Sequence, residues 1–498
     1  MTLDIRAWGW RAALVALVAA LLLPGLLIGP SLDATIFSAV GWRLSAGDAL
    51  YAQVWEQKPP GVFLPYAFAH LLTDDPATAW GIVWTITVAC IGGAALIVRR
   101  ILVDHGVHPL SAGVAASLAA ASAAAYLLSL GGGMSESFAI LPIAAAALLA
   151  SRGRWSWCGL LAGIAIIISF QSISLLVAVT ALGVTANPGT TLRRAGLVAV
   201  GMTAAVAVVA LGLWITGGIG EALDALIGYN SAYVAVARRL GGAAAFALLP
   251  WSVLVLLPLI IGLGLAVIHR HRLASSRLAL AAAAWIVVQI LLIGIQGRFY
   301  AHYATLLVAP MAILAGLGID AAHRTLPRRA AALLLGVPLA AGLVISLVVG
   351  AAGARDERAP VQASNQRAEV VAAEIRGRTA EDDTILVWGN DARVYELADR
   401  RPAIRFVYLY PLLTRDYVTE VRIADLVAEL EQAPPAVVVD TGSLGPGEPG
   451  LPPLLIDRPI ATDGRDEDLL DPLRALVARD YRLVGVIEGW PLYERSAD

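Results

Sequence analysis

The chain has 498 residues, of which 58% are hydrophobic and only 15% are charged, and its formal net charge is −2. Globular domains in water average about 25% charged residues, so this composition excludes an ordinary soluble protein. The nearly balanced charge gives no long-range field that would attract nucleic acid. The two cysteines, Cys90 and Cys158, lie in apolar segments, which excludes a disulfide framework and a cysteine metal cluster.

Apolar runs long enough to cross about 30 Å of hydrocarbon recur along the first 350 or so residues. They predict about eleven transmembrane helices, at roughly 11–30, 78–98, 110–130, 134–150, 157–170, 172–186, 195–215, 244–267, 278–296, 301–319 and 330–351. With the N-terminus in the cytoplasm, every cytoplasmic loop is rich in arginine, as the positive-inside rule requires. This count needs two short crossings that meet near Gln171, and it places the C-terminal part of the chain outside the cytoplasm.

Charged residues become frequent after Arg355, and the apolar segments there have the length of strands. We therefore predict a transmembrane domain at 1–353 and a small extracytoplasmic α/β domain at 354–498. Strands alternating with helices favour a small, mostly parallel sheet. Strands are expected at 384–390, 403–409 and 436–442, a hairpin at 481–496, helices at 391–399 and 416–432, and a long surface loop at 441–472. This domain is expected to cover a site or help receive an acceptor, because it shows no nucleophile–base pattern.

The first outer loop, at 30–77, is too long for a simple connection, and loops of this length are usually functional. Ile36, Phe37, Val40 and Leu44 share one helical face, which predicts a helix lying in the membrane interface. Residues 61–72 are apolar but too short to span, so they are also expected along the surface. The loop should cover the outer leaflet.

Several cations are predicted on the outer side, where topology gives no reason for them: Arg43, Lys58, Arg238, Arg239 and Arg298. An anionic ligand would explain them, and so would pairing with nearby carboxylates at Asp48, Glu56, Glu221 or Asp224. Lys58 is the only lysine among 36 basic residues. A compact ammonium group on a flexible stem is a good phosphate binder, and the two prolines that follow stiffen its turn.

The residues from 33 to 61 resemble the first outer loop of GT-C glycosyltransferases that use polyprenyl-phosphate sugars. They are similar to the branch that includes the protein O-mannosyltransferases, the lipid A aminoarabinose transferase and the RgtA/B/C/D-like bacterial enzymes. The matching pattern is Asp33, Gly47, Tyr51, Trp55, Lys58, Pro59 and Pro60. Residues 131–142 are similar to the family's second outer loop, and residues 297–310 to a late segment in which Arg, His and Tyr meet the carrier.

Two positions depart from the family pattern. Ala34, rather than a glutamate, follows Asp33, which weakens a paired-carboxylate metal site. Gln171 stands where many relatives carry a lysine. The resemblance therefore leaves the identity of the carrier and the use of a divalent metal ion open, with Glu56 as a candidate metal or supporting residue.

The resemblance implies a membrane glycosyltransferase that moves a sugar, with inversion, from a polyprenyl-phosphate donor to an extracytoplasmic acceptor. Asp33 is expected to be the general base, and Glu136, which opens the fourth helix, a second catalytic group. Lys58 and Arg298 are expected to hold the donor phosphate. Three neighbours of Arg298 are expected to hydrogen-bond to the donor: Tyr300, His302 and Tyr303.

Each of these residues also has a structural interpretation. Asp33 could cap the helix that follows it, and Glu136 could be favoured by the dipole of its own helix. His302 could belong to an aromatic belt at the membrane interface. Glu56 could pair with Lys58.

Two other classes of protein compete with a transferase. A transporter or flippase of lipid-linked sugars would also need outer cations, but usually shows internal repeats or ionisable residues near the midplane, and neither is seen. A non-catalytic scaffold would not explain Asp33 and Lys58 in a patterned loop. The expected partners are the lipid-linked donor, an unidentified glycan, lipid or protein acceptor and membrane lipids, in a bacterial plasma membrane.

Overall fold

The computed structural model describes residues 5–186, 188–239, 243–327, 336–414, 417–442, 454–455 and 467–496. Seven of its helices are long and apolar enough to cross a membrane: α1 (Ile5–Ile28), α4 (Pro76–Asp104), α10 (Thr191–Ile215), α13 (Ala243–Ile268), α14 (Ser276–Gln296), α15 (Thr305–Thr325) and α17 (Val337–Arg378). Four shorter apolar helices lie among them: α5 (Pro109–Ala124), α7 (Ser135–Ser151), α8 (Trp155–Ile168) and α9 (Leu175–Ala186). Over the described residues these helices match the predicted spans one for one, and the predicted multi-pass helical membrane fold is confirmed.

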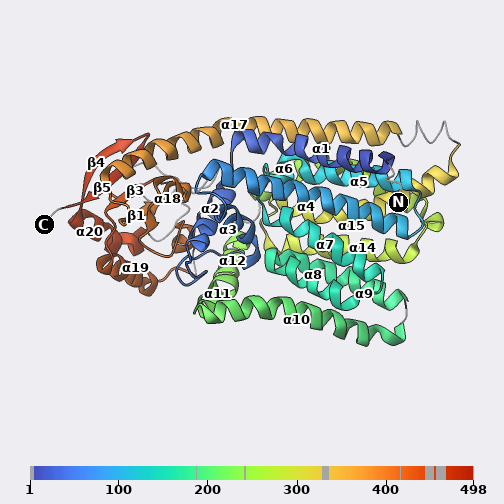
Figure 1. Ribbon diagram of the computed structural model, residues 1–498, viewed down its shortest axis with the longest axis horizontal. Helices are drawn as coiled ribbons and strands as arrows, with labels where there is room; N and C mark the ends of the chain where they lie inside the picture. The colour runs from blue at the N-terminus through green and yellow to red at the C-terminus, as the bar shows by residue number, and fades with distance from the viewer. Residues whose placement is uncertain are drawn as a thin grey trace.

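The helix bundle is built around α15, whose span is 94% buried inside the protein (Figure 1). Small residues allow the helices to approach closely. Gly159 on α8 lies against the backbone of α10, where an added Cβ would come 2.0 Å from the carbonyl oxygen of Val198. The two short crossings, α8 and α9, meet in the short helix η2 (Phe170–Ser174), which contains Gln171 as predicted.

The first outer loop contains α2 (Leu32–Ser45), the turn η1 (Pro60–Val62) and α3 (Leu64–His70). Both predicted surface segments are therefore helical. Ser31 caps α2, because its Oγ accepts a hydrogen bond from the backbone N–H of Ala34 at 3.4 Å. Asp33 lies in the first turn of α2 and is not its cap, but the dipole of α2 favours a carboxylate at that position. A second outer segment follows α10: α11 (Ile219–Leu223), the π-helical turn η4 (Asp224–Tyr229) and α12 (Asn230–Arg239).

The C-terminal part forms a five-stranded sheet in the order β2-β1-β3-β5-β4, built from β1 (Thr384–Trp388), β2 (Arg401–Pro402), β3 (Val437–Asp440), β4 (Tyr481–Ile487) and β5 (Trp490–Arg495). β1 pairs in parallel with β2 and β3, whereas β5 is antiparallel to β3 and β4. The sheet is thus mixed rather than mostly parallel, because the C-terminal hairpin joins it through β5. The helices of this domain are α18 (Arg393–Ala398), α19 (Glu420–Gln432) and α20 (Asp471–Asp480).

The segment that follows β2 departs from the prediction. The strand expected at 403–409 is wrong: after β2 the chain leaves the sheet, and Phe406 forms an isolated bridge with Trp55 of the outer loop. Aromatic side chains there pack on the membrane domain, which outweighs their preference for a strand. Most of the loop expected at 441–472 lies outside the described residues. The predicted domain boundary at 353/354 falls inside α17, which runs from the apolar bundle to the sheet along the top of Figure 1.

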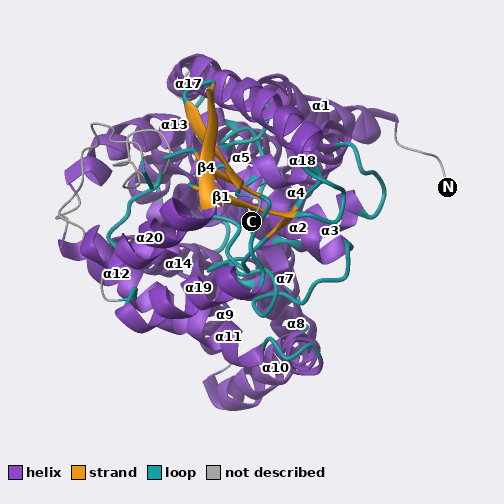
Figure 2. Cartoon of the chain, turned by 90° about the vertical axis from the view of Figure 1, so that its left-hand side faces the viewer, coloured by secondary structure: helices purple, strands orange, loops and turns teal. Residues whose placement is uncertain are grey.

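Trp55 joins three parts of the chain. It is fully buried, and its ring lies 5.4 Å from that of Tyr229 on η4, 5.1 Å from that of Phe406 and 6.2 Å from that of Tyr417, measured between centroids. Its backbone N–H donates to the carbonyl oxygen of Arg405 at 2.8 Å. These contacts seat the sheet domain on the outer loops, in front of the helix bundle as seen in Figure 2.

We expect Trp55→Ala to destabilise this junction by about 3–5 kcal/mol, the usual range for removing a buried tryptophan. Thermal unfolding in detergent measures the effect as a clear fall in Tm. Trp157→Ala is the matched control, because Trp157 on α8 is 60% exposed and should matter little. Equal Tm values for the two variants would contradict the role of Trp55.

Candidate functional site

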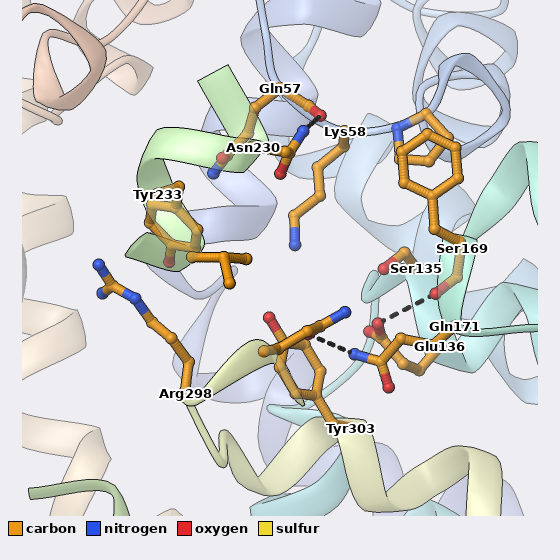
Figure 3. Close-up of a pocket in the computed structure, with 14 residues that line it drawn as sticks. Gln57, Lys58, Ser135, Glu136, Ser169, Gln171, Asn230, Tyr233, Arg298 and Tyr303 are labelled. Carbon is orange, nitrogen blue, oxygen red and sulfur yellow. Dashed lines mark hydrogen bonds between the residues drawn. The ribbon is translucent and has the colours of Figure 1, made fainter. Parts of the chain in front are cut away.

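A cavity of about 150 Å³ lies beneath the first outer loop (Figure 3). Five segments that are distant in sequence line it: the outer loop, the start of α7, η2 with the residue before it, α12, and the end of α14 with the segment that leads into α15. The lining residues are Gln57, Lys58, Pro59, Ser135, Glu136, Ser169, Phe170, Gln171, Asn230, Tyr233, Val234, Gln296, Arg298 and Tyr303. Four of the predicted site residues are among them: Lys58, Glu136, Arg298 and Tyr303.

Lys58 points from its turn into the middle of this cavity (Figure 3). Three contacts hold the turn from different sides. The hydroxyl of Tyr51 donates to the carbonyl oxygen of Lys58 at 2.8 Å, and the Glu56 carboxylate accepts from the Lys58 backbone N–H. Asn230 Nδ2 donates to the carbonyl oxygen of Gln57 at 3.0 Å. The backbone is therefore fixed, and only the side chain of Lys58 remains free to follow a ligand.

Three carboxyl groups and the hydroxyl of Tyr303 influence the charge of the Lys58 ammonium. Burial lowers the pKa of Lys58, but the electrostatic influence of Tyr303, Glu136, Asp33 and Glu56 more than offsets it, so the pKa is raised. Lys58 is consequently charged at neutral pH. The same interactions show that all four groups lie near the ammonium.

Glu136 lies in the first turn of α7 and is 2% exposed. Ser169 Oγ donates a hydrogen bond to its Oε1 at 3.3 Å (Figure 3). Its other oxygen, Oε2, is buried and has no hydrogen-bond partner among the described residues. A buried acceptor without a donor is unfavourable by about 1–3 kcal/mol, so this oxygen is ready to accept a hydrogen bond from a ligand. The dipole of α7 also favours the carboxylate, so both interpretations of Glu136 hold together.

Arg298 follows Gly297, which ends α14 in the left-handed conformation with φ of +70°. Its guanidinium donates to the hydroxyls of Tyr300 at 3.1 Å and Tyr410 at 3.0 Å, and lies 3.9 Å from the ring centroid of Tyr233. No carboxylate is within ion-pair distance of it in the described part of the chain. The charge of Arg298 is thus held by aromatic groups and not neutralised.

Tyr300 and His302 support the wall rather than line the cavity. The ring of His302 is 4.7 Å from that of Tyr303 and 5.5 Å from that of Tyr300. His302 is 5% exposed, so it is a buried group and does not belong to an aromatic belt facing lipid. His302 also interacts electrostatically with Asp33 and Lys58.

Asp33 and Glu56 also lie beside the cavity and outside its lining. Asp33 is half-buried and interacts electrostatically with Lys58 and Tyr303. Glu56 is 2% exposed, and besides the Lys58 backbone N–H it accepts a hydrogen bond from the hydroxyl of Tyr408 at 3.2 Å. Glu56 therefore holds the turn of Lys58 and ties it to the sheet domain, and no ion pair joins the two side chains among the described residues.

A divalent metal ion does not fit the described residues. They contain no group of three or more His, Cys, Asp or Glu side chains close enough to hold one. The carboxylate of Glu56 is already engaged by a backbone N–H and a hydroxyl, and the Lys58 ammonium lies among the remaining carboxylates.

The sequence did not point to five further groups of the site: Ser135, Asn230, Tyr233, Gln296 and Tyr410. Asn230 and Tyr233 lie three residues apart on one face of α12, in the aromatic segment 229–233, which is a signal that was available. Tyr410 comes from the sheet domain, and nothing local links it to Arg298. Among the other outer cations, Arg43 pairs with Asp48, whereas the side chains of Arg238 and Arg239 lie outside the described residues.

Burial raises the pKa of Glu56 to about 7, above its ordinary value of 4.5. The folded state then binds this proton more tightly than the unfolded state does, so the free energy of unfolding falls as pH rises from about 4.5 to 7. We expect Glu56→Gln to remove this pH-dependent loss of stability. The Tm of the variant minus the Tm of wild type should therefore be larger at pH 8 than at pH 4.5. Thermal unfolding at both pH values measures this difference, and a difference independent of pH would contradict it.

Comparisons with known proteins address the fold. No protein-family model matches the chain, and no curated protein matches it in sequence. Among solved structures, ArnT from Cupriavidus metallidurans in the apo state superposes with a TM-score of 0.59 at 14% identity, over 98% of both chains. The structure of the same protein bound to undecaprenyl phosphate gives a TM-score of 0.56 at 13% identity, again over 98% of both chains. Over nearly its whole length, the chain therefore has the fold of ArnT.

Proposed function

We propose that this protein is a membrane glycosyltransferase that moves a sugar from a polyprenyl-phosphate donor to an acceptor on the outer side of a bacterial plasma membrane. The observation that carries the proposal is the cavity under the outer loop, whose lining includes two cations, Lys58 and Arg298, and the unpartnered carboxylate oxygen of Glu136. The cavity occurs in a chain with the fold of ArnT, one structure of which holds undecaprenyl phosphate.

The cations suit a phosphate. Lys58 offers three N–H donors on a flexible stem, and Arg298 offers a planar guanidinium without a carboxylate partner among the described residues. In a site with little water, donors of this kind stabilise the negative charge that grows on a leaving phosphate. We assign both residues to the donor phosphate, with Tyr303 as a hydrogen-bonding neighbour and Tyr300 and His302 behind it.

The reaction is a displacement at the anomeric carbon. The acceptor hydroxyl or amine gives its proton to the Asp33 carboxylate as its oxygen or nitrogen forms the new bond to that carbon. The bond from carbon to phosphate oxygen breaks, and the phosphate keeps the electron pair and leaves as polyprenyl phosphate. Attack from the opposite face inverts the anomeric centre. Glu136 supports the reaction by accepting a hydrogen bond from the acceptor or the sugar through its free oxygen.

The test is a transfer assay with the purified full-length chain, radiolabelled polyprenyl-phosphate sugars and a membrane extract. Movement of label to an acceptor supports the proposal, and the labelled product identifies the acceptor class. Undecaprenyl phosphate binding is measured in parallel. If the protein neither binds the carrier nor consumes any donor of a broad panel, the transferase proposal fails. Translocation of the donor across vesicles without transfer would favour the flippase alternative.

A further inference from the structure

A chain of hydrogen bonds connects the cavity wall to the interior of the helix bundle. Trp285 Nε1 donates to Ser174 Oγ at 3.0 Å, and Ser174 Oγ donates to Gln289 Oε1 at 2.6 Å. Gln289 Nε2 then donates to Gln171 Oε1 at 3.0 Å, and Gln171 Nε2 donates to Gln296 Oε1 at 2.9 Å. The last two residues, Gln171 and Gln296, line the cavity.

This chain of hydrogen bonds joins α14 to η2. Trp285, Gln289 and Gln296 lie on one face of α14, at spacings of four and seven residues, and the other two members belong to η2. Its inner members are buried, with Gln289 fully inaccessible and Trp285 1% exposed. Water does not compete for these groups, and an unpaired polar group in so apolar a bundle is unfavourable. All four hydrogen bonds are therefore favoured to stay formed.

The indole of Trp285 sets the direction of the whole chain. The two ends of a glutamine amide have nearly the same shape, so their orientation follows from the network around them. Because an indole N–H can only donate, Ser174 accepts from it and donates its own O–H to Gln289. The 2.6 Å separation between Ser174 and Gln289 is typical of O–H···O and short for N–H···O. Each amide then turns its oxygen toward Trp285 and its NH₂ group toward the cavity.

Gln296 is the last residue of this chain of hydrogen bonds. Its oxygen is occupied by Gln171, and no described residue accepts a hydrogen bond from its NH₂ group. Resting on the proposed function, we infer that this chain fixes Gln296 as an uncharged hydrogen-bond donor to an oxygen atom of the lipid-linked sugar, either a phosphate oxygen or a sugar oxygen. Trp285, Ser174 and Gln289 are positioning residues, because they act on the ligand only through the two amides.

Gln296→Glu tests the inference directly. The carboxylate keeps an oxygen that accepts from Gln171 but replaces the NH₂ donor with an acceptor. We expect the Kd for undecaprenyl phosphate to rise more than tenfold if the partner is a phosphate oxygen. If the partner is a sugar oxygen, that Kd stays constant and KM for the sugar-loaded donor rises instead. Gln432→Glu, an exposed position on α19, controls for the added charge. Wild-type values for both constants would overturn the inference.

Trp285→Phe is the second variant, since it removes the indole donor and keeps an aromatic ring. The two glutamine amides are then free to reverse. We expect whichever constant Gln296→Glu raises, Kd for undecaprenyl phosphate or KM for the donor, to rise about 2- to 10-fold, with kcat unchanged. This is the range expected for the loss of one neutral hydrogen bond. A fall in Tm with no change in either constant would show a structural role alone and overturn the inference. If wild type itself neither binds undecaprenyl phosphate nor transfers sugar, the proposed function fails; if wild type does both and the two variants match it, only this inference fails.

Discussion

Asp33→Asn is expected to slow sugar transfer by about 10²–10⁴-fold, the usual contribution of a general base. The amide cannot take the acceptor proton, but it is close in size to the carboxylate and leaves the Ser31 cap of α2 intact. Binding of undecaprenyl phosphate should hold or tighten slightly, because Asp33 is one of the negative groups around Lys58. Single-turnover kinetics with saturating donor separates the chemical step from binding.

The control for this variant is Asp74→Asn, an exposed acid in the same outer loop, which should keep the wild-type rate. Glu136→Gln is the informative comparison. Glu136 faces the cavity and Asp33 lies beside it, so the two carboxylates compete for the role of base. A full rate in Asp33→Asn together with a loss of two or more orders of magnitude in Glu136→Gln would transfer that role to Glu136.

Lys58→Met is expected to weaken the binding of undecaprenyl phosphate about 10- to 150-fold. A hydrogen bond to a charged group is worth about 1.5–3 kcal/mol, and each 1.4 kcal/mol is a factor of ten in Kd. Transfer should fall at least as far, because the charge that Lys58 stabilises grows as the phosphate leaves. Equilibrium binding in detergent measures the first effect, and Arg482→Met, an exposed cation on β4, is the control for lost charge.

The single lysine of the chain allows an independent check. Lys58 carries the only ε-amine in the protein, so an acylating reagent modifies it alone among the side-chain amines. Undecaprenyl phosphate should slow that modification, as measured by mass spectrometry of the peptide that contains Lys58. Unchanged labelling at saturating carrier, with Lys58→Met binding as tightly as wild type, would remove Lys58 from the phosphate site.

Local sequence patterns were sufficient to predict the helices of the membrane domain and of the outer loop. The thickness of the hydrocarbon sets the length of a crossing, so hydropathy alone located the apolar helices, including the two short ones that meet at Gln171. The outer loop carried its own signals, in the helical face of Ile36, Phe37 and Val40 and in the lone lysine. In the sheet domain the same approach failed at 403–409, because contacts with Trp55 outweighed local strand propensity.

Composition and hydropathy were sufficient to identify a multi-pass membrane protein and to single out its unusual cations. Which of these cations reach the cavity depends on how the helices and the sheet domain pack. Arg43 and Arg298 look alike as predicted outer cations, yet Arg43 is paired with Asp48, whereas Arg298 lines the cavity and donates to Tyr410, 112 residues away. The physical reason is that hydropathy and periodicity report on neighbours within a few turns of chain. A cavity is made by side chains that meet only after the helices pack.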